Sequence, residues 1–187
     1  ENEEEEEEIK VHTFNMNHLD MINPGVEEAQ KLKKAILFID EAKTFMEFYK
    51  YQTITHLDFY DIQLFKDKEK MRKKLIGAMD YNQPLWIDMH DSPIEKDIIF
   101  KEDEDINKAT FPKTLIDYKY FVEEDYKRLM RENEKYGRMR DSVLWVGDHF
   151  YFGIRTTKKI EDIPEEFLKK MYILRVIEEE IEEEEED

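Results

Sequence analysis

The acidic residues of this chain are concentrated at its two ends, and this separation limits what the middle can fold into. Glu1 and Glu3 to Glu8 open the sequence, and Glu178 to Asp187 close it with only Ile181 between acids. These two runs hold sixteen of the eighteen excess negative charges, which leaves residues 9–177 with 31 acidic and 29 basic side chains. A nearly neutral segment of this length is typical of one globular domain. We therefore predict an acidic tail over 1–8, a single domain over 9–177 and an acidic tail over 178–187.

The composition of the chain favours a packed core and excludes several kinds of site. Apolar residues make up 40% of the chain and aromatic residues 13%, which is enough to build a core. The absence of cysteine excludes disulfides, thiolate metal sites and cysteine nucleophiles, and it fits a reducing compartment. No run of about 18 apolar residues is present, and the acidic N-terminus is unlike a secretory leader. We therefore expect an intracellular protein, cytoplasmic or nuclear, without a membrane span. Because the chain does not begin with Met, we also expect it to be a segment of a longer acidic protein.

Apolar spacing predicts three helices. The strongest pattern follows the start signal at Asn23 and Pro24 and continues at three- and four-residue steps to Phe48, which predicts a helix of roughly 25 residues. Similar spacing predicts helices over 114–136 and from Pro164 to about 177. Residues 55–79 fit either one helix or a strand followed by a lysine-rich helix from about residue 67.

Several shorter runs are typical of strands. Residues 9–16 alternate loosely and fit an edge strand, residues 84–90 form an apolar run, and residues 94–100 fit a further strand. Over 142–155, two aromatic runs flank Gly147-Asp148, a pair suited to the two-residue turn of a β-hairpin. The fold class predicted from these elements is α+β. We expect three to four helices packed on a small, mostly antiparallel sheet that ends in this C-terminal hairpin.

Histidine and aspartate lie close together in the sequence at several points, which raises the question of a metal site. Four of the five histidines have an Asp within two positions, and these side chains are ligands for zinc, manganese and non-haem iron. The best candidate set is Asp88, His90, Asp91 and His149. However, the chain has 17 aspartates, so such pairs arise by chance, and no metal motif of fixed spacing is present. We expect no metal, no cofactor and no catalytic residue, and we expect Asp88 to face water because its apolar neighbours point to the opposite face.

Other catalytic motifs are missing from the sequence. Ser92 and Ser142 are the only serines, and neither lies in a G-x-S-x-G turn. Neither a G-x-G-x-x-G nor a G-x-x-x-x-G-K-[ST] phosphate loop is present, so we do not expect nucleotide binding through a glycine-rich loop.

Charge and aromatic content instead favour binding to another protein. The acidic runs repel nucleic-acid phosphates and anionic lipids, so we expect neither free nucleic acid nor a membrane as a partner. Basic proteins are attracted, and the acidic residues predicted to attract them are Glu3, Glu4, Glu5, Glu6, Glu182, Glu183 and Glu184. An alternative is that the runs only raise solubility. Large rings near the predicted hairpin suggest an aromatic binding surface, with core packing as the alternative: Trp145, Phe150, Tyr151 and Phe152.

The predicted function is therefore a non-catalytic protein-interaction module, either an adaptor or an inhibitor. Its predicted partner is a histone, another basic nucleic-acid-binding protein, or the basic nucleic-acid cleft of an enzyme. Three alternatives stay open: a virus-encoded inhibitor that partly mimics nucleic acid, a metal-dependent hydrolase or nuclease, and a structural subunit of a large assembly. The sequence does not fix the oligomeric state.

Overall fold

Six parallel strands form one sheet at the centre of the computed structural model, which describes residues 8–137 and 143–178. The order across the sheet is β1-β6-β2-β5-β4-β3, and every neighbouring pair is parallel. The strands are β1 Val11–Asn15, β2 Ile36–Asp40, β3 Thr55–Asp58, β4 Leu85–Asp88, β5 Phe152–Thr156 and β6 Tyr172–Ile177. The α-helices are α1 Ile22–Lys31, α2 Phe45–Tyr49, α3 Ile62–Lys66, α4 Lys68–Asp80, α5 Lys96–Ile99, α6 Tyr118–Glu123 and α7 Glu165–Lys170. Short 3-10 helices are η1 Met16–Met21, η2 Lys113–Leu115, η3 Asp125–Leu129 and η4 Ile160–Asp162.

The sheet corrects the predicted fold class. An α+β fold with a small, mostly antiparallel sheet and three to four helices was wrong, because the described residues form an α/β fold with a parallel sheet and seven α-helices. The central strands are buried on both faces, and all five residues of β2 and all four of β4 are buried. Strands of this kind read as continuous apolar runs, so they lack the alternation that identifies a half-exposed strand.

The predicted helix over residues 24–48 is in fact α1, β2 and α2 in succession. Helix α1 ends in a turn in which the Lys34 N–H donates to the Ala29 carbonyl at 2.9 Å and the Lys33 N–H donates to the Gln30 carbonyl at 3.1 Å. Lys33 takes a left-handed conformation with φ of 51°. This position usually carries glycine or asparagine. Because a lysine stands there, the sequence shows no stop signal.

The other predicted elements are partly confirmed. Strand β1 lies at the edge of the sheet as predicted, and β4 is the strand predicted over 84–90. Residues 55–80 form a strand followed by a lysine-rich helix, which was one of the two alternatives for this segment. The helix predicted over 114–136 is broken into η2, α6 and η3, and the one predicted from Pro164 is α7 followed by strand β6. Residues 94–100 contain helix α5 instead of a strand. No hairpin exists among the described residues of 143–155, because β5 pairs only with the parallel strands β2 and β4.

Gly147 allows the side chain of Asn82 to lie close to the backbone, and it does not form a hairpin turn. A Cβ atom at this position would lie 2.1 Å from the side-chain oxygen of Asn82. That oxygen accepts hydrogen bonds from the backbone N–H groups of His149 and Phe150 at 3.0 and 3.1 Å. The segment before β5 is therefore held against the turn that follows α4.

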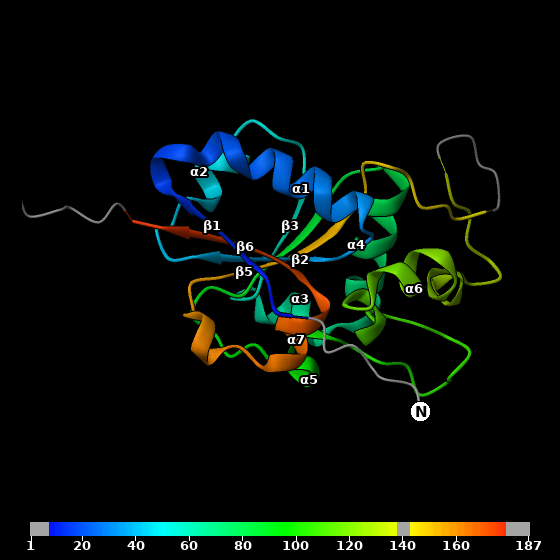
Figure 1. Cartoon of the computed structure of the whole chain (residues 1–187). Coiled ribbons are helices and arrows are strands. Elements are labelled where there is room, and N and C mark those ends of the chain that lie inside the picture. Colours follow the sequence, from blue (N-terminus) through cyan, green and yellow to red (C-terminus); the bar gives the residue numbers. More distant parts are fainter. Residues whose placement is uncertain (1–7, 138–142, 179–187) are drawn as a thin grey trace, which may run out of the picture.

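Helices cover both faces of the sheet (Figure 1). Helices α1 and α2 lie on one face, and α3, α5 and α7 lie on the other. The chain moves along the sheet from β1 through β2 to β3 and then returns through β4 and β5 to β6. The adjacent strands β2 and β5 are therefore followed by helices on opposite faces, α2 and α7. In open α/β sheets, ligands bind at the carboxyl ends of the strands at such a switch point.

Among the described helices, none has the length and apolar character needed to cross a bilayer.

A buried arginine fixes the segment after η3 to helix α4. Arg72 is 1% exposed, and one of its guanidinium nitrogens donates to the Leu129 carbonyl and to a carboxylate oxygen of Glu134, both at 2.8 Å. A second carboxylate, that of Glu69, accepts from Arg72 at 2.9 to 3.1 Å. The hydrogen bonds from Arg72 lower the pKa of Glu134 to about 2.

Replacing Arg72 with methionine is expected to return the carboxyl pKa of Glu134 from about 2 toward its ordinary value of 4.5. A depressed pKa stabilises the fold above the unfolded-state pKa, and this contribution is lost as pH falls through the folded value. In the variant, the free energy of unfolding should therefore no longer carry the pH dependence that comes from the lowered pKa of Glu134. Carboxyl NMR titration of Glu134 checks this, with Glu69→Gln as the control that leaves the Arg72–Glu134 contact in place. An unchanged titration in Arg72→Met would contradict the assignment.

Candidate functional site

The register of the parallel strands places charged side chains in one row at the carboxyl edge of the sheet. Asp58 of β3 is paired with Asp88 of β4, and Asp88 is paired with Arg155 of β5. On β2, Phe38 is the residue opposite Arg155, and Asp40 lies two positions further on. Paired residues, and residues two apart on a strand, point to the same face. The four charged side chains therefore lie on the face that α2 covers, beside the β2/β5 switch point.

Arg155 lies between two buried carboxylates. Its Nη1 donates to Asp88 at 2.9 Å, and its Nη2 and Nε donate to one oxygen of Asp40 at 2.8 and 3.1 Å. Asp40 is fully buried, and Asp88 and Arg155 are nearly so. The Asp40 carboxylate also accepts from the backbone N–H groups of Thr44 and Phe45 at 2.7 and 3.1 Å. These bonds fix the start of α2 and use both oxygens of Asp40.

The environment of Asp88 keeps its carboxylate charged. Burial acts to raise its pKa, but a hydrogen bond from His56, the positive charge of Arg155 and further hydrogen bonds outweigh burial, so the pKa of Asp88 is below its ordinary value. The expectation that Asp88 faces water was wrong, because its relative exposure is 3%. That expectation assumed that one face of the strand is open to water, but both faces of this parallel sheet are covered.

His90 follows β4 and forms the next layer outward. Its backbone is left-handed, with φ of 51°, and its N–H donates to Asp88 at 3.1 Å. Its Nε2 lies 2.8 Å from a carboxylate oxygen of Asp58, and its ring stacks on Tyr60 with centroids 4.1 Å apart. The backbone turn thus brings the imidazole back over the strand ends.

The outermost layer is exposed. The Tyr60 hydroxyl donates to Asp91 at 2.7 Å, and this hydrogen bond raises the pKa of Tyr60 and lowers the pKa of Asp91. Tyr60 is 58% exposed, and the side chain of Asp58 is 45% exposed. We call the four outer residues Asp58, Tyr60, His90 and Asp91 the acidic-aromatic platform. Two carboxylates beside an aromatic face attract a cationic group and repel anions.

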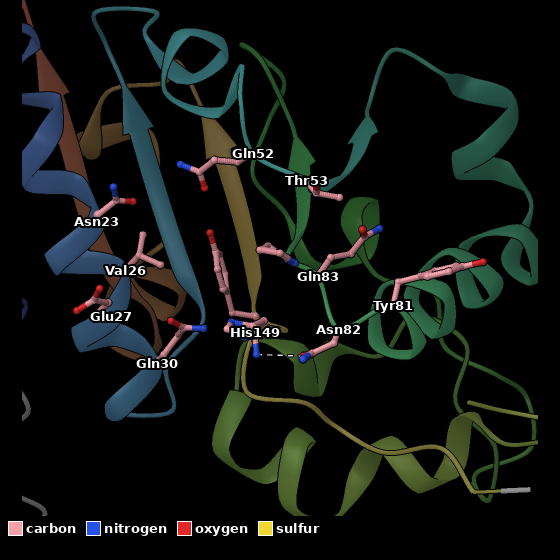
Figure 2. A pocket seen from close by; sticks show the side chains of 12 residues that line it. Asn23, Val26, Glu27, Gln30, Gln52, Thr53, Tyr81, Asn82, Gln83 and His149 are labelled. Atoms are coloured by element: carbon pink, nitrogen blue, oxygen red, sulfur yellow. Dashed lines mark hydrogen bonds between the residues drawn. The ribbon is translucent and has the colours of Figure 1, made fainter. Parts of the chain in front are cut away.

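Three of the four metal candidates come together here, and the fourth does not. Asp88, His90 and Asp91 lie at the carboxyl edge, but His149 precedes β5 and lies near Asn82 at the opposite edge of the sheet (Figure 2). Over residues 8–137 and 143–178, no three His, Asp or Glu side chains are grouped so that they could hold a metal ion. The guanidinium of Arg155 already lies between the two strand-end carboxylates, where it balances their charge.

The predicted aromatic surface is mostly core. Phe150, Tyr151 and Phe152 are at most 5% exposed, whereas Trp145 is 49% exposed. The alternative of core packing therefore describes three of these four rings. The acidic residues predicted to attract a partner lie outside the described residues: Glu3, Glu4, Glu5, Glu6, Glu182, Glu183 and Glu184.

Sequence reasoning missed Asp40, Asp58, Tyr60 and Arg155. A signal was present for Asp40, because both FID at 38–40 and WID at 86–88 are apolar runs that end in aspartate. No comparable signal marks Arg155, whose partners lie 67 and 115 residues away in the chain.

Comparison of the chain with protein-family models, with curated proteins and with solved structures gives no match.

Proposed function

We propose that this protein is a non-catalytic interaction module, an adaptor or inhibitor, that binds a basic segment of a partner protein at the carboxyl edge of its sheet. The observation that carries the proposal is the acidic-aromatic platform, in which the stacked rings of Tyr60 and His90 lie between the exposed carboxylates of Asp58 and Asp91. A lysine or arginine of the partner would lie over the ring and contact a carboxylate.

The C-terminal acidic run starts from the same edge. Strand β6 ends at Ile177, and Glu178 then begins the run. Strands β6 and β4 are three positions apart in the sheet, which corresponds to about 14 Å at about 4.8 Å per strand. This separation is longer than the screening length of about 8–10 Å at physiological salt, so the run and the platform would contact different residues of one extended basic segment. The run and the platform therefore act on the same basic segment: the run attracts it over a distance, and the platform selects it on contact.

A single exposed ion pair contributes little, which is why the proposal needs both parts. Such pairs are typically worth about 0.2–1 kcal/mol. Two platform carboxylates alone would give weak binding, whereas a run of glutamates adds many weak, salt-sensitive attractions. Suitable partners are a histone, another basic nucleic-acid-binding protein or the basic cleft of an enzyme. An intracellular location, cytoplasmic or nuclear, is part of the same proposal.

The proposal is tested with a lysine- and arginine-rich peptide and the full chain. Deleting residues 178–187 is expected to weaken binding and to flatten its dependence on salt. The double variant Asp58→Asn/Asp91→Asn is expected to weaken binding by about fivefold with a similar salt dependence, on the scale of two exposed pairs. Isothermal titration calorimetry at two salt concentrations measures both effects.

The matched control is Glu104→Gln/Glu132→Gln, which removes two exposed acids that lie outside the platform. Its affinity should stay close to that of the unmodified chain. Equal losses in the two double variants would show that only net charge matters. Unchanged affinity after the deletion would mean that the acidic run does not take part in binding and only raises solubility.

A further inference from the structure

A hollow lies at the opposite edge of the sheet from the platform. It is a groove of about 710 Å³ that is bounded by α1, by residues 52–53 before β3, by the turn over 81–84 and by the segment before β5. Figure 2 shows side chains from these separate parts of the chain arranged round one space. Its volume is within the range of about 300–1,000 Å³ that is usual for small-molecule sites.

The lining of the groove is rich in side-chain amides and has no positive charge. The whole chain contains eleven Asn and Gln residues, and five of the twelve residues that line the groove are of these types: Asn23, Gln30, Gln52, Asn82 and Gln83. No Lys or Arg lines the groove, and Glu27 is its only carboxylate. The lining therefore does not favour phosphates or carboxylates, but it suits a neutral ligand that forms hydrogen bonds.

Hydrogen bonding within the protein leaves both donors and acceptors of these amides for a ligand. The amide nitrogens of Gln30 and Gln52 donate to the backbone carbonyls of Asp148 and Phe48, at 3.1 and 3.4 Å, and that of Gln83 donates to the Thr55 hydroxyl at 2.6 Å. Within the described chain, the side-chain oxygens of these three glutamines accept no hydrogen bond, and each amide nitrogen keeps a second N–H. A ligand that matches them must both donate and accept hydrogen bonds, as the hydroxyl groups of a sugar do.

One wall of the groove is held in place before any ligand binds. Asn82 is left-handed, with φ of 50°, and its side-chain oxygen accepts from the backbone N–H of His149 (Figure 2). The same oxygen accepts from the backbone N–H of Phe150. The absence of a Cβ atom at Gly147 permits this contact. A pre-formed wall lowers the entropic cost of binding.

Apolar side chains complete the lining. Val26 and Tyr151 are 8% and 5% exposed, and Pro84 lies beside them in the lining. A pyranose ring presents C–H groups on its faces and hydroxyls at its rim, which matches an apolar strip bordered by amides. We propose that this groove binds a neutral carbohydrate.

The test uses the full chain and three neutral trisaccharides as probes: maltotriose, cellotriose and triacetylchitotriose. At least one is expected to give saturable amide NMR shifts confined to residues that line the groove. Adenosine is the comparison probe, because it is also neutral and forms hydrogen bonds but has a flat aromatic base. The double variant Asn23→Ala/Gln52→Ala should weaken sugar binding by about tenfold, as expected for two neutral hydrogen bonds.

Both substitutions affect exposed side chains, so the fold should be kept. The matched control Gln63→Ala/Asn133→Ala removes two exposed amides outside the groove and should bind like the unmodified chain. The proposal is overturned if no trisaccharide shifts the groove residues, if adenosine binds there in place of the sugars, or if the groove variant keeps full affinity. None of these outcomes depends on whether a basic peptide binds at the carboxyl edge.

Discussion

Replacing Arg155 with methionine is expected to lower the free energy of unfolding by about 3–5 kcal/mol at neutral pH, the usual cost of breaking a buried ion pair. The guanidinium is the group that lies between the Asp40 and Asp88 carboxylates. Methionine fills part of the same volume but carries no charge. Two buried carboxylates would then face each other without the positive charge that lies between them, which is the costly step. Urea unfolding followed by circular dichroism measures the loss.

Arg175→Met is the matched control. Arg175 also lies on a strand and also pairs with a carboxylate, that of Glu41 at 3.0 Å, but its side chain is 32% exposed. This pair is partly exposed, so its loss should cost clearly less than the loss of the buried Arg155 contacts, on the scale of about 1 kcal/mol. Adding Asp88→Asn to Arg155→Met should recover part of the loss, because a neutral amide needs no counter-charge. Equal losses of unfolding free energy in the two arginine variants would show that the buried network does not stabilise the fold more than a partly exposed ion pair does.

The effect of Arg155→Met also depends on pH with a definite sign. In the unmodified protein the pKa of Asp88 is below its ordinary value, so Asp88 stabilises the fold above its unfolded-state pKa of about 3.9 and loses this contribution as pH falls through the folded value. Without Arg155, burial is opposed only by the hydrogen bonds from His56 and from the His90 N–H, so the pKa of Asp88 should rise. On acidification, protonation of Asp88 removes the buried charge that destabilises the variant. The difference in the free energy of unfolding between the two proteins should therefore narrow below about pH 4.

The sequence predicted local elements better than their arrangement. The edge strand over 9–16 and the strand over 84–90 were predicted correctly from short runs, whereas the similar run over 94–100 contains helix α5, because a short apolar run fits either a strand or a buried helix. The 24–48 helix failed because its positions 29, 32, 36, 39 and 42 keep helical spacing across a chain reversal at Lys33. Only tertiary burial of β2 on both faces distinguishes the two structures, and spacing does not record it.

The Gly147-Asp148 pair misled the prediction of the sheet. Glycine there satisfies both a hairpin turn and a close contact with Asn82, which is 65 positions earlier in the sequence. The local sequence is the same for both. Since the hairpin was the main reason for expecting antiparallel strands, one ambiguous glycine decided the predicted fold class.

The candidate site could be predicted only in part. Asp88, His90 and Asp91 are neighbours in sequence, so the link between histidine and carboxylate was visible there. Their partners Asp58 and Arg155 join them only through strand register, which depends on the strand order of the whole sheet. A parallel sheet brings together the ends of strands that are far apart in the chain, and a single sequence does not reveal that order.

Trp86→Ala is expected to cost about 3–5 kcal/mol of unfolding free energy, the usual loss for a buried tryptophan. Its ring is fully buried and has Phe38, Phe45 and Tyr49 around it. Within the described chain its indole N–H has no hydrogen-bond partner. Packing, not hydrogen bonding, therefore holds the ring, and its shape must match its neighbours.

Gly153 supplies the flat surface on which this ring lies. A Cβ atom there would be 2.4 Å from the indole ring, so Gly153→Ala should cost about 1–3 kcal/mol by overpacking. Gly77→Ala is the control, because a Cβ atom on this helical glycine meets nothing within 4 Å, and it should stabilise the protein by up to about 1 kcal/mol. In the double variant Trp86→Ala/Gly153→Ala the added methyl enters the space that the indole leaves. The combined loss should thus be smaller than the sum of the single losses by at least about 1 kcal/mol. Strict additivity would mean that the residue pair does not couple β4 to β5, and that the strand register beneath the carboxyl-edge charges is set elsewhere.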